Sequence, residues 1–84
     1  MKLNILHFVD NAQVSTFEVE GTVKSSVASL RSSQALVLAE PTATTFDRVQ
    51  WVRDGVAKDY RIATVLKRKS DVRHAPFCYD VQLG

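Results

Sequence analysis

The 84 residues, 45% of them hydrophobic, predict a single domain over residues 1–84, because so short a chain cannot bury two separate cores. A domain of this size has a small core, so we expect a symmetric partner, a homodimer, to stabilise it. The single cysteine, Cys78, excludes an internal disulfide and a Cys-rich zinc framework. Since no apolar run reaches the roughly 20 residues of a membrane span and no signal-peptide pattern opens the chain, we expect a cytoplasmic protein without a membrane partner.

The net charge of +2 is distributed unevenly along the chain. Between Arg48 and His74, eight Lys or Arg residues outnumber three Asp residues and give +5, whereas residues 1–47 carry −2 and Asp80 carries −1. A local positive potential raises the association rate with anionic partners and is screened by salt. The charge pattern therefore favours an anionic partner for one segment of the chain.

Residues 2–9 and 14–20 flank a turn-prone segment, which predicts an N-terminal hairpin, and the second of the two runs alternates apolar and polar side chains. The first of these strands is apolar on both faces, so we expect it to be internal or covered by a second layer. The sequence pattern does not decide the register of this hairpin. A two-residue loop would pair Leu6 with Phe17, and a three-residue loop would pair Ile5 with Phe17.

Residues 22–32 fit a short helix, because Val23, Val27 and Leu30 fall on one helical face. Several serines in this segment compete for backbone hydrogen bonds, which leaves an irregular strand as the alternative. The apolar residues 35–39 predict a short buried strand.

Residues 46–68 form the most strongly patterned segment, two alternating runs that meet at Asp54-Gly55 and predict a second hairpin. A four-residue loop would set Trp51 across from Tyr60, and we expect this register because aromatic cross-strand pairs stabilise a sheet. A two-residue loop would instead place Trp51 across from Lys58 and bring two arginines opposite each other. The hairpin is therefore expected to have an apolar face and a cationic face.

The last two predicted strands each have an apolar face. Tyr60, Ile62 and Leu66 are expected to point to the core, and residues 77–83 alternate in the same way. The predicted fold is mainly β, of the α+β type: an antiparallel sheet of about five to six strands with at most one short helix. The hairpin-then-helix order of residues 16–30 resembles β-grasp domains, which are the alternative fold.

The cationic face and the hairpin tip are the candidate site for nucleic acid. Such side chains neutralise phosphates, and amide or guanidinium groups bond or stack on unpaired bases. The candidate residues are Arg48, Gln50, Arg53, Lys58, Arg61, Lys67, Lys69 and Arg73. The competing interpretation is a solvated sheet face whose cations prevent aggregation. If the two faces were reversed, Trp51 and Tyr60 would form the stacking surface instead.

Other chemistry has little support in the sequence. His74, Cys78 and Asp80 fall short of a recognised metal-ligand set, so Cys78 is interpreted as a small hydrophobic residue and His7 as a core-edge histidine with a hydrogen-bond partner. Glycine-rich phosphate loops and the common hydrolase motifs are missing. We therefore predict a protein that is not an enzyme and has no metal or other cofactor.

The order of elements resembles the sheet portion of single-stranded RNA phage coat proteins. The resemblance rests on FVDN at the first turn, VASL, RVQWVRDGVAKDYRIATVLK and CYDVQL. Lys58, Tyr60 and Ile62 match a Lys-x-Tyr-x-apolar strand of that family. The family's two C-terminal helices, which interlock its dimer, have no counterpart before Gly84.

This resemblance implies that the polar sheet face binds an RNA stem-loop inside a viral shell. The positions it implies are Arg48, Gln50, Arg61, Lys67 and Gln82. We therefore expect a protein that binds RNA or another single-stranded nucleic acid, self-associates, and is cytoplasmic or, if coat-like, part of a virion. The alternative is a protein-interaction module, such as a small virus-encoded inhibitor that docks on a nucleic-acid-binding partner.

Overall fold

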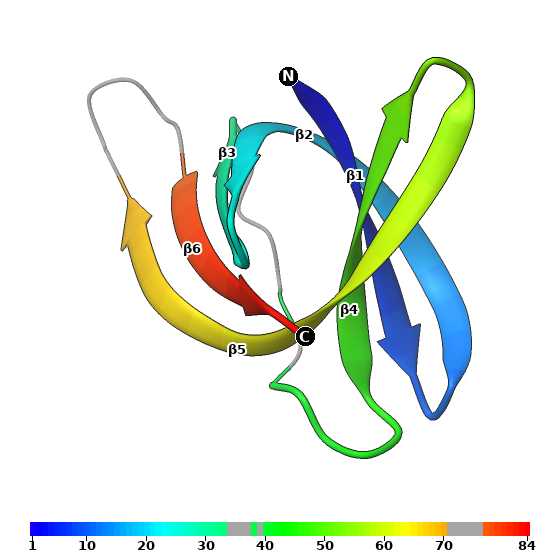
Figure 1. Ribbon diagram of the computed structural model, residues 1–84. Coiled ribbons are helices and arrows are strands. Elements are labelled where there is room, and N and C mark those ends of the chain that lie inside the picture. The colour runs from blue at the N-terminus through cyan, green and yellow to red at the C-terminus, as the bar shows by residue number, and fades with distance from the viewer. Residues whose placement is uncertain (34–37, 39, 71–76) are drawn as a thin grey trace.

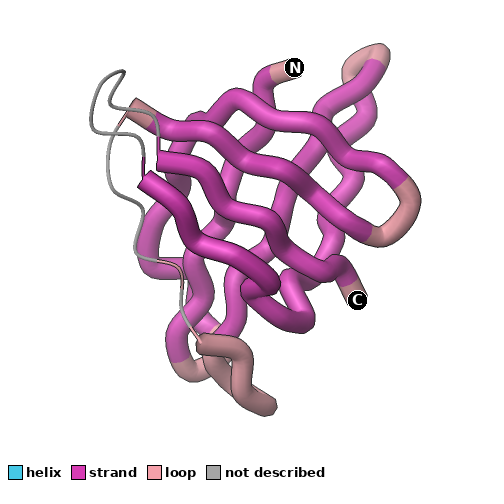
Figure 2. The backbone as a smooth tube through the Cα atoms, turned by 90° about the vertical axis from the view of Figure 1, so that its left-hand side faces the viewer, coloured by secondary structure: helices cyan, strands magenta, loops and turns pink. Residues whose placement is uncertain are grey.

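Six antiparallel strands close into a barrel in the spatial order β1-β2-β3-β6-β5-β4 (Figures 1 and 2). The computed structural model describes residues 1–33, 38, 40–70 and 77–84. The strands are β1 (Lys2–Val9), β2 (Ala12–Lys24), β3 (Val27–Ser32), β4 (Phe46–Arg53), β5 (Val56–Ser70) and β6 (Phe77–Leu83). Because β4 returns to pair with β1 after the first three strands, the first four strands form a Greek key.

The prediction of a mainly β fold is confirmed, but the short helix is wrong. Residues 22–32 belong to β2 and β3, which a two-residue turn at Ser25-Ser26 joins. Ser25 has a φ of 57°, so the serines expected to weaken a helix serve a turn instead. The described residues contain no helix, and therefore none that could cross a membrane; the β-grasp alternative gains no support from them.

The interior of the barrel is filled by alternate side chains from all six strands. The buried cluster consists of Leu3, Ile5, Val19, Ala28, Leu30, Leu38, Val49, Ile62, Tyr79, Val81 and Leu83. The strand predicted over residues 35–39 lies outside the described residues except for Leu38, which contributes to this cluster.

The first strand is internal, as its two apolar faces predicted, because β1 pairs with β2 on one side and β4 on the other. Its turn has two residues, Asp10 and Asn11, yet Ile5 pairs with Phe17. A bulge beside His7 supplies the extra residue and shifts the register. Neither loop length alone would have predicted this combination.

The second hairpin is formed by β4 and β5, but its predicted four-residue loop is wrong. Asp54 and Gly55 form a two-residue turn, with φ values of 52° and 78°, and Trp51 lies across from Lys58. Two positive φ values are typical of a type I′ turn, whose twist matches that of the flanking strands. Trp51 and Tyr60 therefore meet as diagonal neighbours, not as a direct pair.

The end of this hairpin projects beyond the barrel (Figure 1). β1 pairs with β4 only as far as Gln50, and β6 pairs with β5 only from Ile62 onwards. Residues 51–58 therefore form a two-stranded ribbon with no further strand on either side among the described residues, whereas residues 59–61 lie across from residues 48–50, which β1 still pairs. Every strand of the closed barrel has a neighbouring strand on each side over part of its length.

The predicted inward position of Leu66 is wrong, since this side chain is 54% exposed. In the pairing of β5 with β6, register shifts occur between Ile62 and Thr64 and between Val65 and Lys67. Each shift adds a residue to β5 and changes which side chains face inward. Val65, rather than Leu66, packs against the core.

Replacing Gly55 with alanine is expected to lower the free energy of unfolding by about 1 kcal/mol, because a left-handed backbone conformation is unfavourable for residues with a Cβ atom. A Cβ atom at this position would meet nothing within 4 Å, so the effect is conformational and not steric. Guanidinium-chloride unfolding followed by circular dichroism measures it. An unchanged midpoint would show that the turn relaxes to another type.

Candidate nucleic-acid interface

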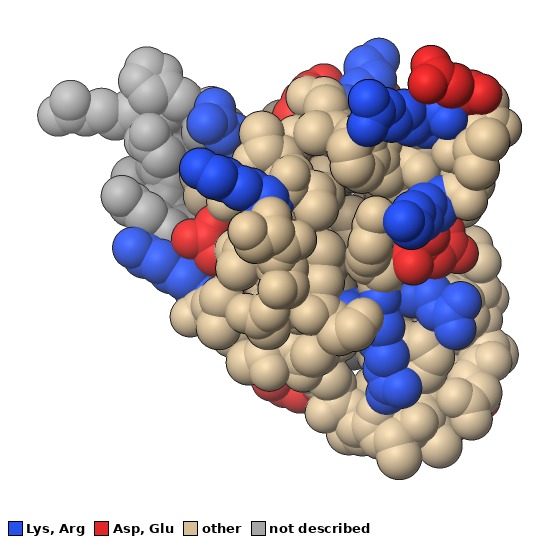
Figure 3. Space-filling view, viewed as in Figure 1, with Lys and Arg blue, Asp and Glu red and all other residues tan. Residues whose placement is uncertain are grey.

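The basic residues of the second hairpin lie on its two opposite sides. The concave side continues the barrel interior from Val49, and the convex side continues the barrel exterior. Since side chains alternate along each strand, Arg53 and Lys58 lie on the concave side, whereas Arg48 and Arg61 lie on the convex side. Figure 3 shows Lys and Arg side chains gathered over this hairpin.

An open groove of about 480 Å³ lies on the concave side of the projecting ribbon. Its lining consists of Trp51, Arg53, Asp54, Val56, Lys58 and Tyr60. Tyr60 lies at the rim of the barrel, across from Val49, and the ribbon carries the other side chains of this groove past that rim, where no further strand covers them among the described residues. The groove therefore combines aromatic rings, positive charge and access to solvent.

Each aromatic ring in the groove has a cation next to it. The guanidinium carbon of Arg53 lies 5.7 Å from the centroid of the Trp51 ring, and Lys58 Nζ lies 5.6 Å from that of Tyr60. Both rings are half-buried, because they also pack against the barrel core. The core fixes the rings, and the cations remain exposed beside them. This arrangement provides stacking surfaces for unpaired bases and positive charge for the adjoining phosphates.

Trp51 and Tyr60 were predicted on the core side of the hairpin, and the structure confirms this side. Neither residue belongs to the predicted site, because a side chain that faces the core is expected to be covered. The dipeptide Asp54-Gly55 carried a usable signal: it favours a two-residue turn. That turn places Lys58 directly across from Trp51.

On the convex side, Arg48 and Arg61 lie directly across from each other and pack over aromatic rings. The guanidinium carbon of Arg48 is 4.8 Å from the Phe8 ring centroid and 5.3 Å from that of Phe46. The guanidinium carbon of Arg61 is 4.1 Å from the Phe46 centroid. The two rings stack on each other at 5.2 Å. Beside them, Gln50 accepts a hydrogen bond from Asn4 at 3.2 Å.

The remaining candidate residues lie away from the groove. Lys67 is exposed and lies across from Asp80, and Gln82 donates a hydrogen bond to the Ser26 carbonyl at 3.0 Å. Lys69 is part of β5, and Arg73 lies outside the described residues. The structure therefore brings together Arg53 with Lys58, and Arg48 with Arg61, but places Gln82 in a contact between two strand ends.

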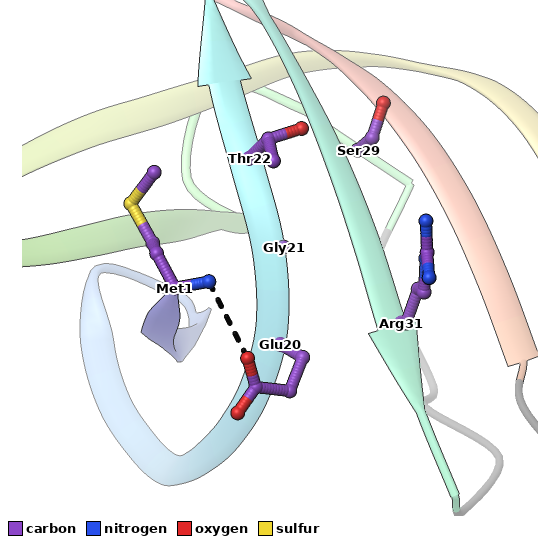
Figure 4. Close-up of a pocket in the computed structure, with 6 residues that line it drawn as sticks. All are labelled: Met1, Glu20, Gly21, Thr22, Ser29 and Arg31. Atoms are coloured by element: carbon purple, nitrogen blue, oxygen red, sulfur yellow. Dashed lines mark ion pairs between the residues drawn. The ribbon is translucent and has the colours of Figure 1, made fainter.

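A smaller cavity, of about 190 Å³, lies where β2 passes from β1 to β3 (Figure 4). The N-terminal amine forms an ion pair with Glu20 at 3.4 Å, and Arg31 on the neighbouring strand extends away from that carboxylate. In the described part of the chain, every buried side-chain polar atom has a hydrogen-bond partner. This cavity therefore offers a ligand no buried polar group in need of a partner.

His7 has a structural partner, as expected. Its Nδ1 atom lies 2.6 Å from Oδ1 of Asp47, directly across the β1–β4 ladder, and Asp47 is only 1% exposed. Cys78 is a half-buried free cysteine on β6. His74 lies outside the described residues. No group of three or more His, Cys, Asp or Glu side chains suited to a metal ion occurs among the residues that the structure describes.

Comparisons of the chain with protein-family models, with curated proteins and with solved structures found no match. The geometry of the hairpin therefore provides the basis for a functional proposal.

Proposed function

We propose that the protein binds single-stranded nucleic acid, RNA included, through the concave groove of the β4–β5 hairpin, and that its role is binding without catalysis. The observation that carries the proposal is the placement of Trp51 and Tyr60 in an open groove with Arg53 and Lys58 beside their rings. Bases supply flat apolar faces and phosphates supply negative charge, so a single strand matches both halves of this lining. Self-association and a coat-like role remain predictions.

The positions of the two rings indicate whether the groove suits a single strand or a double helix. Trp51 and Tyr60 occupy diagonal positions on neighbouring strands, so they provide two adjacent stacking sites and not one continuous surface. A duplex keeps its bases stacked on one another, whereas an unpaired strand can present them to protein rings. The groove therefore favours unpaired nucleotides over a double helix.

Trp51→Ala is expected to weaken the binding of a labelled random single-stranded oligonucleotide about 5- to 150-fold, because each base–aromatic stack contributes roughly 1–3 kcal/mol. Fluorescence anisotropy at low salt measures the affinity. In the native chain the single tryptophan gives a second readout, since stacking of a base on its ring quenches its emission. Trp51→Phe keeps an aromatic ring and should retain part of the affinity.

Charge variants provide the control for folding, since Lys58 is exposed and its replacement removes no core contact. Lys58→Glu should weaken binding, whereas Lys24→Glu, the same charge change at an exposed position on β2, should leave the affinity nearly unchanged. Lys58→Gln should also make the logarithmic salt dependence less steep by about 0.7, the contribution of one neutralised phosphate in a single strand. Equal effects at positions 24 and 58 would contradict a localised groove.

The alternative role, docking on a protein partner, predicts no affinity for nucleic acid alone. Absence of binding by the native chain at low salt would therefore overturn the proposal and favour that alternative. Binding that survives Trp51→Ala and Lys58→Glu together would show that nucleic acid binds elsewhere on the protein.

A further inference from the structure

The convex side of the hairpin carries a second arrangement of cations, independent of the groove. Arg48 and Arg61 are direct cross-strand neighbours. Both guanidinium carbons lie over the same Phe46 ring, at 5.3 and 4.1 Å from its centroid. The distance between the two carbons is therefore at most the sum of these two distances, so the two positive charges lie close together. Like charges placed opposite each other destabilise a sheet. The repulsion between these two arginines must therefore be offset by other interactions.

Interactions within the protein offset part of the repulsion between Arg48 and Arg61. The faces of Phe8 and Phe46 attract the guanidinium groups, and Arg61 donates a hydrogen bond to the Thr42 carbonyl at 2.7 Å. Neither arginine forms an ion pair with a carboxylate among the described residues. On the same side of the hairpin, Asp59 lies two residues before Arg61 and across from Gln50. The protein thus supports the arginines without neutralising them by direct ion pairing.

We propose that Arg48 and Arg61 together bind a phosphate group on the convex side of the hairpin. A guanidinium group that lies against a ring still has N–H groups at its edge, and two such groups can hold the oxygens of one tetrahedral anion. Phe46 is only 5% exposed, and the half-buried ring of Phe8 stacks on Phe46 and lies against Arg48, so both rings are already engaged by protein groups. The ligand chemistry is therefore that of the phosphate alone, which a free phosphate ion or a nucleic-acid backbone can supply.

Inorganic phosphate tests the site directly. Phosphate should replace chloride at constant ionic strength, with binding followed by isothermal titration calorimetry and by the thermal unfolding midpoint. The native chain should show saturable binding and a rising midpoint, and Arg48→Gln and Arg61→Gln should each weaken the affinity about tenfold. Arg31→Gln, an exposed arginine on β3, is the matched control and should bind as the native chain does. Asp59→Asn should strengthen binding, because it removes a negative charge from the same side of the hairpin.

Two results would overturn the proposal: no saturable binding by the native chain, or equal binding by the native chain and both arginine variants, as a general salt effect would produce. Lys58→Glu should leave phosphate binding intact. The phosphate site on the convex side and the nucleic-acid site in the groove can therefore be confirmed or contradicted independently of each other. A weaker oligonucleotide affinity in Arg48→Gln would identify the backbone as the source of the phosphate. Unchanged oligonucleotide affinity with lost phosphate binding would identify the free ion.

Discussion

Replacing Gly21 with alanine is expected to destabilise the barrel by about 3 kcal/mol, among the largest effects that a single methyl group can have in this chain. An ideal Cβ atom at this position would lie 2.3 Å from the backbone oxygen of Ser29 and 3.2 Å from Cδ1 of Leu3. A backbone oxygen in a strand ladder cannot move aside without breaking its pairing, so the strands must separate, and overpacking of this kind typically costs 1–3 kcal/mol or more.

The position of Gly21 explains why the effect should reach the whole fold. Glu20 pairs both with Lys2 on β1 and with Arg31 on β3, so β2 changes partners at this point to continue the barrel. Guanidinium-chloride unfolding measures the loss, with Thr22→Ala, an exposed neighbour on β2, as the control. A loss below about 1 kcal/mol would mean that β2 and β3 separate easily here, which a tightly closed barrel does not allow.

Asp47→Ala is expected to lower the free energy of unfolding by about 3 kcal/mol. The carboxylate is 1% exposed and lies 2.6 Å from Nδ1 of His7, which is itself largely buried. Removing one member of a buried pair leaves the other without its partner, and such losses typically amount to 3–5 kcal/mol. Chemical denaturation at neutral pH provides the measurement.

A double variant separates the interaction from the loss of packing. In His7→Leu/Asp47→Leu both members of the pair are replaced by apolar side chains, so neither is left buried without the other, and this change should cost less than Asp47→Ala alone. If the double variant were the less stable of the two, the pair itself would provide net stabilisation to the barrel. An Asp47→Ala variant as stable as the native chain would contradict the burial of this carboxylate.

Local patterns in the sequence predicted most strands but not how they close. The β4–β5 hairpin and β6 follow from alternation and β1 from its apolar residues, because each has an apolar face that must be buried. The helix predicted over residues 22–32 is wrong because a strand, a two-residue turn and a second strand happen to place Val23, Val27 and Leu30 at helical spacing. The pairings β1–β4 and β3–β6 join residues far apart in the chain, and no local pattern specifies them.

The sequence predicted which charged residues belong to the candidate site, but it did not predict the shape of the site. The cations of the hairpin follow from composition alone, whereas the groove depends on the register and on where the barrel ends. The two-residue turn places Lys58, and not Tyr60, across from Trp51, which brings a cation to the aromatic lining of the groove. Residue alternation, by itself, also could not show that residues 51–58 extend past their neighbouring strands.

The lack of lateral strand partners along residues 51–58 also gives the ribbon a mechanical property. A two-stranded segment outside a closed barrel can flex about its base near Gln50 and Asp59 without breaking the ladders that hold the barrel shut. The charged tip of the hairpin can therefore move at little energetic cost while the core keeps Trp51 and Tyr60 in place, so ligands of different thickness can fit beside the same rings.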